Sequence, residues 1–271
     1  MRLVTYRSER GDRAGVLRGE MVVDAGPSVR ALLAANDVAC AVDETAGDER
    51  PLAEVELLPP VPDPEKIVCI GLNYRPHAEE AGIDPPESPT FFGKYRNALA
   101  APGAEVPLPE SSAKVDFEAE VAIVIGRPAQ AVGVGAALGH VAGYTLLNDL
   151  SARDLQFATP QWMPGKVFDG SAPMGPALVT PDEAGPHDAI EIALDLNGER
   201  MQEESTRELI FGVPELVAHL SGLMTLRPGD VIATGTPAGV GSTRQPRVWL
   251  QPGDRIEISS PTLGRLETTI R

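Results

Sequence analysis

The chain has 271 residues, of which 42% are hydrophobic and 23% charged, and its formal net charge is −16 at pH 7. This composition indicates a soluble globular protein, and the acidic balance disfavours nucleic acid and anionic membranes as partners. No apolar run approaches the roughly 20 residues of a membrane span, and the charged N-terminus lacks the apolar segment of a secretory signal. Cys40 and Cys69 are expected to be ordinary reduced thiols, so we expect a cytoplasmic protein.

Residues 1–62 are predicted to form a small α+β domain ahead of a larger one at 63–271. Short strands separated by charged turns are expected at Leu3–Tyr6, Ala14–Leu17 and Met21–Asp24. Ser28 can cap a short helix that runs through Ala35. The proline-rich stretch PPVPDP at 59–64 breaks regular structure and is typical of a linker, which places the domain boundary there.

The larger domain is predicted to be rich in strands and loops. Apolar residues alternate with less apolar ones over 190–196 and lead into Asn197-Gly198, which is typical of a type I′ hairpin turn. Ser205 and Glu208 have capping-box spacing ahead of a helical stretch that continues to Leu220. With 26 prolines and 27 glycines, the chain fits a loop-rich β architecture better than a helical bundle.

The sharpest signal is a strand with two glutamates, DFEAEVAIVIG at 116–126. Side chains alternate between the faces of a strand, so one face is expected to carry Phe117, Ala119, Val121, Ile123 and Ile125. Glu118 and Glu120 share the other face with Ala122 and Val124. Two carboxylates about 7 Å apart on a covered face must be protonated, pair with cations or bind a metal. Alternatively, the strand end dips into solvent and both glutamates are hydrated.

A second segment, GYTLLNDLSARDLQ at 143–156, predicts an apolar strand that ends at Asp149 and a helical turn after it. A carboxylate at a strand end is well placed to join a set of metal ligands. Arg153 and Gln156 lie three residues apart on one side of the turn. Arg153 could bind a substrate carboxylate through two hydrogen bonds, or it could form a salt bridge to Asp149 or Asp154.

The segment GLNYRPHAEEAG at 71–82 predicts a short helix, because Pro76 suits its first turn and Gly82 its C-cap. His77 and Glu80 then lie on one face, three residues apart. A carboxylate that touches an imidazole raises its basicity, so this pair could activate a water molecule. It could equally be an ordinary surface pair.

Three further features could hold a substrate anion. Lys94 follows the apolar pair Phe91-Phe92, and Lys166 lies in the segment PGKVFD, although either could be an ordinary surface lysine. The backbone N–H groups of the glycine-rich segment at 234–241, with the Thr236 hydroxyl, could cradle a carboxylate or form a plain connection.

These segments, in this order, resemble the fumarylacetoacetate hydrolase family over roughly residues 66–271. The matching phrases are GLNYRPHAEEAG, FFGK, DFEAEVAIVIG, VAGYTLLNDLSARDLQ, GKVFDGSAPMGP, LDLNGERMQ and LRPGDVIATGTPAGVG. Seven matches in order are far more specific than any one of them. The resemblance implies a β-rich α+β fold, a mixed β-roll or β-sandwich, usually assembled as a homodimer.

The resemblance also implies roles for individual residues. A divalent metal, Mg²⁺ with Mn²⁺ or Ca²⁺ as alternatives, is expected between Glu118, Glu120 and Asp149. His77 and Glu80 are implied to activate water beside the active-site lysine Lys166. The substrate contacts are expected to be Lys94, Arg153, Gln156 and Thr236. A mobile segment over 77–89 is expected to close over the substrate, because its glycine and prolines offer little regular structure.

The resulting hypothesis is a metal-dependent hydrolase that cleaves a carbon–carbon bond in a small anionic 2-oxo acid of the acylpyruvate type. The alternatives within the enzyme class are a decarboxylase or isomerase of unsaturated 2-oxo dicarboxylates in aromatic catabolism, and a ureidoglycolate lyase. A non-catalytic, metal-bound binding protein is the alternative of another class.

Overall fold

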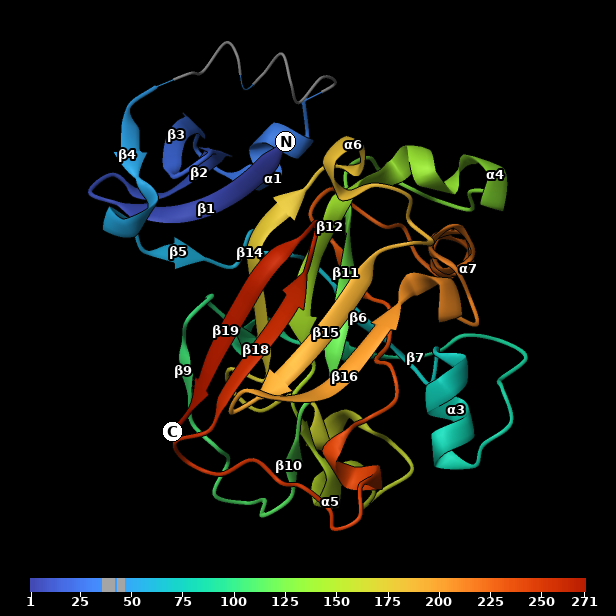
Figure 1. Ribbon diagram of the computed structural model, residues 1–271. Helices are drawn as coiled ribbons and strands as arrows, with labels where there is room; N and C mark the ends of the chain where they lie inside the picture. The colour runs from blue at the N-terminus through green and yellow to red at the C-terminus, as the bar shows by residue number, and fades with distance from the viewer. Residues whose placement is uncertain (36–41, 43–46) are drawn as a thin grey trace.

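Strands dominate the protein. The computed structural model describes residues 1–35, 42 and 47–271, so Cys40 lies outside the described residues, while Cys69 is buried and free. The described strands form three sheets, one large, one of five strands and one of two (Figure 1). This β-rich architecture of mixed sheets with few helices confirms the expected fold class.

The large sheet is mixed. Its strands follow the order β4-β3-β2-β1-β14-β12-β11-β17-β6-β7, with β5 paired to β1 and β8 to β14. Most neighbours are antiparallel, but β17 with β6 and β14 with β8 are parallel. The bounds are β1 (Arg2–Ser8), β2 (Gly11–Arg18), β3 (Met21–Gly26), β4 (Glu49–Pro51), β5 (Leu57–Leu58), β6 (Ile67–Gly71), β7 (Thr90–Lys94), β8 (Leu99–Ala100), β11 (Ala119–Ile125), β12 (Val141–Asn148), β14 (Ala172–Val179) and β17 (Val231–Ala233).

The five-stranded sheet lies in front of the large one in Figure 1. Its order is β16-β15-β18-β19-β9, and the two-stranded sheet joins β10 to β13. The bounds are β9 (Glu105–Val106), β10 (Val115–Asp116), β13 (Ser151–Ala152), β15 (Glu191–Leu196), β16 (Glu199–Ser205), β18 (Arg255–Ser260) and β19 (Gly264–Ile270).

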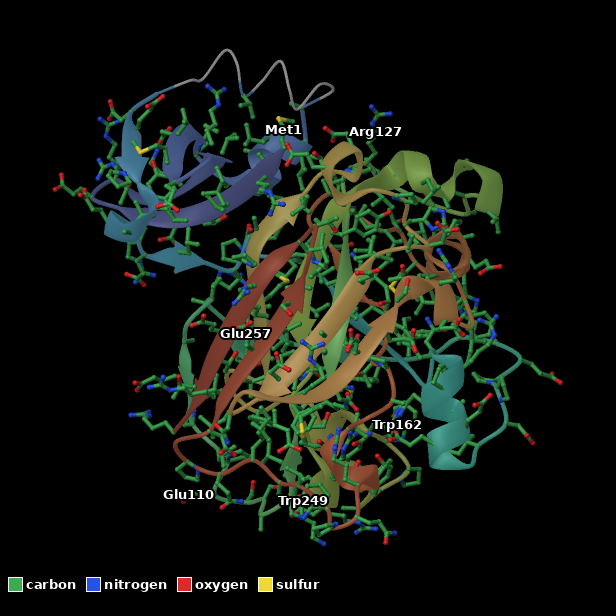
Figure 2. The ribbon with its side chains drawn as sticks, in the orientation of Figure 1. Met1, Glu110, Arg127, Trp162, Trp249 and Glu257 are labelled. Atoms are coloured by element: carbon green, nitrogen blue, oxygen red, sulfur yellow. The ribbon has the colours of Figure 1, made fainter. Side chains whose placement is uncertain are left out.

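The main hydrophobic core lies between these two sheets, and side chains fill the space between their ribbons (Figure 2). The five residues predicted to share one face of β11 and its approach all belong to this core: Phe117, Ala119, Val121, Ile123 and Ile125. They meet Ile192, Leu194, Ile256, Ile258 and Leu266 of the facing sheet. Ala122 and Val124 pack into other clusters, so the predicted alternation is confirmed and both faces of the strand are covered.

The N-terminal strands continue the large sheet, because β1 pairs antiparallel with β14. Ser28 caps α1 (Val29–Leu33) by accepting a hydrogen bond from the Ala31 N–H, and the helix ends two residues before the predicted Ala35. The stretch at 59–64 contains neither helix nor strand, yet Val61 is fully buried. The division into domains at residue 62 stays a prediction.

The remaining helical segments among the described residues are short. They are α3 (Arg75–Ala81), α4 (Val134–Ala137), α5 (Arg153–Gln156), α6 (Pro181–Ala184), α7 (Val213–Leu223) and the 3₁₀ turns at Leu52–Glu54, Arg96–Ala98, Leu138–His140, Met163–Gly165, Thr206–Glu208 and Gly241–Thr243. None of the described helices is long and apolar enough to cross a membrane.

Two local predictions had different outcomes. Asn197 and Gly198 join β15 to β16 with φ of 54° and 83°, so the predicted hairpin is confirmed. The predicted continuous helix from Ser205 is wrong, because a 3₁₀ turn at Thr206–Glu208 is separated from α7. The N–H groups of residues 210 and 211 donate to the backbone and side-chain oxygens of Asn73 instead of continuing a helix.

Candidate active site

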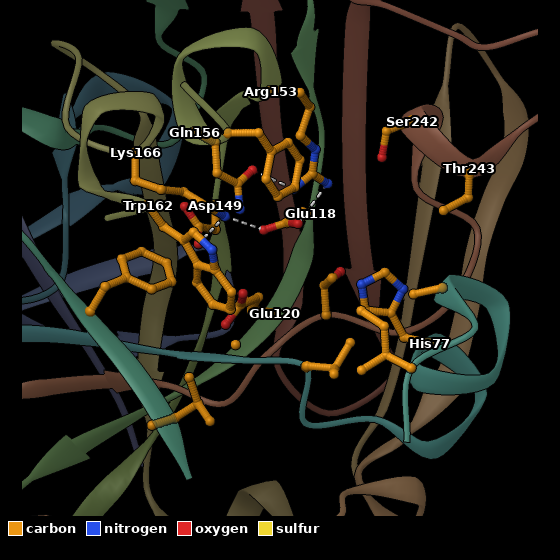
Figure 3. Close-up of a pocket in the computed structure, with 18 residues that line it drawn as sticks. His77, Glu118, Glu120, Asp149, Arg153, Gln156, Trp162, Lys166, Ser242 and Thr243 are labelled. Carbon is orange, nitrogen blue, oxygen red and sulfur yellow. Dashed lines mark hydrogen bonds and ion pairs between the residues drawn. The ribbon is translucent and has the colours of Figure 1, made fainter. Parts of the chain in front are cut away.

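Three buried carboxylates converge at one end of the β11–β12 pair (Figure 3). Glu118 precedes β11, Glu120 lies in it, and Asp149 follows β12, whose Asn148 pairs with Ala119. The Asp149 N–H donates to the Glu118 carbonyl at 2.9 Å, which fixes the two chain segments together. One oxygen from each carboxylate lies within 4.8 Å of the others. We call Glu118, Glu120 and Asp149 the carboxylate cluster; their exposures of 5%, 2% and 1% exclude the hydrated alternative.

Two cationic side chains that line the cavity contact the cluster. Lys166 Nζ lies 2.6 Å from Glu118 Oε2 and 2.9 Å from Asp149 Oδ2. Arg153 Nη2 lies 2.7 Å from Glu118 Oε1. Burial opposes ionisation of Glu118, but the charges of Arg153 and Lys166 outweigh burial and hold its pKa well below the usual value. Glu118 is therefore a stable anion.

Glu120 is in a different electrostatic position. Its carboxylate accepts a hydrogen bond from the Gly235 N–H at 2.7 Å, and no Lys, Arg or His among the described residues forms an ion pair with it. Burial raises its pKa well above the usual value, and the neighbouring charges of Asp149 and Glu118 raise it further. Glu120 is thus the carboxylate of the cluster that no described cation pairs with, and the cluster offers oxygen ligands to a divalent cation.

Lys94 lies behind the cluster. Its ammonium is completely buried, 2.9 Å from Asp149 Oδ1 and 2.9 Å from Ser171 Oγ, and it donates to the Lys166 carbonyl. It is not among the described residues that line the cavity. Because β7 places this side chain on the far side of Asp149, its position favours support of that carboxylate over the predicted contact with substrate.

Asp116 is a buried residue of the site that the sequence analysis did not single out. Its carboxylate accepts hydrogen bonds from the Gly241 and Ser242 N–H groups at 2.7 and 3.1 Å. It also binds Arg153, with Nε at 2.9 Å and Nη2 at 2.8 Å. Arg153 Nη1 in turn donates to Gln156 Oε1 at 2.9 Å, so the predicted neighbours Arg153 and Gln156 are in contact. Asp116 therefore links the guanidinium to the loop after β17.

His77 and Glu80 lie on α3, and His77 faces the carboxylate cluster across the cavity (Figure 3). His77 Nδ1 is 3.1 Å from Glu80 Oε2, and these side chains are 13% and 25% exposed. Glu80 Oε1 accepts a hydrogen bond from the Gly239 N–H at 3.0 Å. Burial opposes ionisation of Glu80, but the hydrogen bonds that it accepts, led by the one from His77, outweigh burial and lower its pKa. Glu80 thus stays ionised, and it can orient the imidazole and stabilise its protonated form.

The loop at 234–241 does cradle carboxylates, but those of the protein itself. Its glycine N–H groups donate to Glu120, Glu80 and Asp116. The Thr236 hydroxyl accepts a hydrogen bond from Gln202 Nε2 at 2.9 Å and faces the cavity. This loop therefore connects both sides of the site.

A cavity of about 200 Å³ brings most of the predicted site residues together. Its lining includes Glu118, Glu120, Asp149, His77, Lys166, Arg153, Gln156 and Thr236. Glu80 stands behind His77, and Lys94 stands behind Asp149. The apolar part of the lining, including Trp162 and Phe157, was not predicted from the sequence.

Comparisons with known proteins agree with this architecture. Residues 66–271 match the family described as fumarylacetoacetate (FAA) hydrolase C-terminal. A Bos taurus protein named "Oxaloacetate tautomerase FAHD2B, mitochondrial" is 43% identical over 217 residues, which are 79% of this chain and 69% of that protein. The chain therefore belongs to the fumarylacetoacetate hydrolase family, whose members are enzymes.

Several solved structures cover the whole of this chain, and two of them show the range of their names. The fumarylacetoacetate hydrolase from Exiguobacterium antarcticum has a TM-score of 0.88 at 32% identity and is covered to 99%. The 2-hydroxyhepta-2,4-diene-1,7-dioate isomerase from Mycobacterium marinum has a TM-score of 0.84 at 33% identity and is covered to 98%. The relatives are thus named for different reactions on one shared fold.

Proposed function

We propose that this protein is a divalent-metal-dependent enzyme of small 2-oxo acids and that it hydrolyses a carbon–carbon bond of the acylpyruvate type. One observation carries the proposal: a buried carboxylate cluster, whose Glu120 has no ion-pair partner among the described residues, faces His77 of the His77–Glu80 pair across one cavity. This arrangement suits an enzyme that holds a cation at the carboxylate cluster and transfers a proton at the His77–Glu80 pair.

The cluster fits a hard divalent cation, because Glu120 is a buried carboxylate without a cationic partner among the described residues. Glu118, Glu120 and Asp149 would hold Mg²⁺, and Mn²⁺ or Ca²⁺ suits the same oxygen ligands. When bound, the cation would supply Lewis-acid stabilisation of the enolate that remains after the bond breaks.

The cationic and polar residues around the cluster would orient the substrate. Arg153 and Lys166 would attract its carboxylate, and both have positions fixed by ion pairs before substrate arrives. Gln156 and Thr236 line the same cavity and would donate hydrogen bonds to substrate oxygens. Prepositioned donors of this kind lower the cost of orienting the substrate.

His77 and Glu80 would carry the proton transfers. His77 faces the cavity, so its imidazole would remove a proton from the water that attacks the distal carbonyl. Glu80, bound to His77 Nδ1, would fix the ring orientation and stabilise the protonated imidazole.

Isomerisation or decarboxylation of a 2-oxo acid is the second candidate. The relatives named oxaloacetate tautomerase and 2-hydroxyhepta-2,4-diene-1,7-dioate isomerase favour it. No attacking water is needed in such reactions, so the His77–Glu80 pair would only move protons. The homodimer and the cytoplasmic location stay predictions, and a monomeric mass by light scattering would count against the homodimer.

The variant Glu80→Gln distinguishes the two candidates. It keeps the side-chain shape and removes the charge, so hydrolysis of an acylpyruvate should fall by about 10²–10⁴-fold in kcat with little change in KM. Decarboxylation of oxaloacetate by the same variant should fall much less. Glu79→Gln, on the exposed neighbour in the same helix, is the control and should change neither activity. Equal losses of both activities in Glu80→Gln would remove the water-activating role from this pair.

A further inference from the structure

The side of the cavity that carries His77 needs a hydrogen-bond donor if the proposed hydrolysis is to occur there. When water adds to the distal carbonyl of an acylpyruvate, the electron pair of the carbonyl bond moves onto its oxygen, which becomes an anion. Such an oxyanion is stabilised by a donor whose position is fixed in advance. Arg153 and Lys166 lie beside the carboxylate cluster and form ion pairs there (Figure 3). The distal oxygen therefore calls for a donor nearer to His77.

A 3₁₀ turn at Gly241–Thr243 brings two hydroxyl side chains to this side of the cavity. Ser242 and Thr243 both line the cavity, and Figure 3 shows them on the same side as His77. The loop that leads into the turn is tied to α3, because the Gly239 N–H donates to a carboxylate of that helix at 3.0 Å. The turn and the imidazole therefore face the cavity from adjoining segments.

Of these two hydroxyl groups, that of Ser242 is free to donate to a ligand. The Thr243 hydroxyl donates to the Val240 carbonyl at 3.0 Å. It also contacts Glu80, whose pKa burial raises and the hydrogen bonds from His77 and then Thr243 lower. Ser242 donates through its backbone N–H, but its hydroxyl has no hydrogen-bond partner among the described residues. A bound substrate oxygen would supply that partner.

The backbone of the turn fixes the position of Ser242. The N–H groups of Gly241 and Ser242 donate to the buried Asp116 carboxylate at 2.7 and 3.1 Å. A Cβ atom on residue 241 would lie 2.2 Å from the Val248 carbonyl oxygen, so glycine is required for this close approach. Asp116 also accepts a hydrogen bond from Arg153 Nε at 2.9 Å. One buried carboxylate thus sets the positions of both the guanidinium and the serine.

We propose that the Ser242 hydroxyl donates a hydrogen bond to the distal carbonyl oxygen of the substrate and stabilises the oxyanion that forms there. His77 takes a proton from the attacking water, whose oxygen bonds to the distal carbon. When the carbonyl re-forms, the carbon–carbon bond breaks and its electron pair becomes the enolate of the 2-oxo acid. The enolate carbon then receives the proton held by His77. This inference rests on the proposed function, because the hydrolysis creates the oxyanion.

Ser242→Ala tests the proposal in the Mg²⁺-loaded full chain, with 2,4-dioxopentanoate as the acylpyruvate. Its kcat for hydrolysis should fall at least about tenfold, because loss of one oxyanion donor typically costs about 10²–10³-fold. Calorimetric titration with oxalate, which has no distal carbonyl, should give the same Kd as wild type. Ser242→Thr keeps a hydroxyl and should retain more hydrolysis than Ser242→Ala. Ser259→Ala, at a partly buried serine of β18 outside the cavity lining, is the control and should change neither measurement.

The outcomes separate this inference from the proposed function. Hydrolysis by Ser242→Ala within about twofold of wild type would overturn the inference and leave the proposed function standing. A weaker oxalate affinity in Ser242→Ala, or equal losses in Ser242→Ala and Ser242→Thr, would also overturn it, because the serine would then act by shaping the site. If wild type binds oxalate but does not hydrolyse 2,4-dioxopentanoate, the proposed hydrolysis fails and the inference fails with it.

Discussion

The two sides of the cavity differ in how they are held. The carboxylate cluster belongs to strands paired on both sides, since β11 lies between β12 and β17, and its oxygens contact buried cations. The opposite side is the seven-residue helix α3, where Glu80 is tied to the loop after β17 by the Gly239 N–H. One side is held by strand pairing and buried ion pairs, whereas we expect the other to move as a unit.

This difference assigns cation binding to the carboxylate cluster and proton transfer to α3. Buried charges must be held in place by several partners, because an unpaired ion in the interior is costly. A proton-transferring pair instead needs access to solvent and later shielding from it. We therefore expect substitutions behind the carboxylate cluster to affect stability and cation binding, and substitutions on α3 to affect rate.

The largest stability effect is expected from Lys94→Met. The change removes a buried ammonium and leaves Asp149 without that partner. Loss of one member of a buried pair costs about 3–5 kcal/mol, which denaturant unfolding of the metal-free protein should show. Lys114→Met, at an exposed lysine, should change the free energy of unfolding by less than about 0.5 kcal/mol. A small effect of Lys94→Met would mean that the cluster does not depend on this support.

A smaller effect is expected from Asp116→Asn. The amide cannot pair ionically with Arg153, so the guanidinium loses the partner that orients it. Loss of such an outer partner typically costs about 10–100-fold, and we expect a loss of this size in kcat/KM with KM raised for a 2-oxo acid. Asp154→Asn, on the next residue of α5, should leave both constants near wild type. A change in stability with unaltered KM would assign Asp116 a purely structural role.

The smallest expected effect is a local slowing of amide hydrogen exchange. Residues 77–89 should exchange amide hydrogens more slowly when Mg²⁺ and oxalate are present, because the segment closes over the bound anion. Exchange in β11 should be slow in both conditions, since its strand is buried at every position. Equal exchange over 77–89 with and without oxalate would mean that α3 does not close.

Several features of the fold and site could be predicted from the sequence because they depend on short-range patterns. Alternation in 116–126 predicted both faces of β11, and Asn197-Gly198 predicted the hairpin. The His77–Glu80 contact followed from helical spacing. Assembly of the carboxylate cluster needed the resemblance to the family as well, because Asp149 is distant in the sequence.

The remaining features depend on long-range packing. Nothing in the segment FFGK shows on which side of Asp149 the Lys94 ammonium lies, since pairing of β7 with β6 decides it. Asp116 binds N–H groups about 125 residues away in the chain, and no local pattern reports that contact. The apolar part of the cavity lining is likewise assembled from single residues in separate strands and loops, so periodicity could not identify it.

The central claim is that the carboxylate cluster holds a divalent cation. Lys166 and Arg153 contact the cluster but do not take the place of this cation. Thermal unfolding of wild type and Glu120→Gln, each with and without Mg²⁺, tests it most directly. Wild type should gain about 2.7 kcal/mol at a Mg²⁺ concentration of 100 Kd, whereas Glu120→Gln should gain far less. Without Mg²⁺ the variant should be at least as stable as wild type, because it lacks a buried carboxylate that no cation compensates. Equal stabilisation of both proteins by Mg²⁺, or none of wild type, would contradict the account.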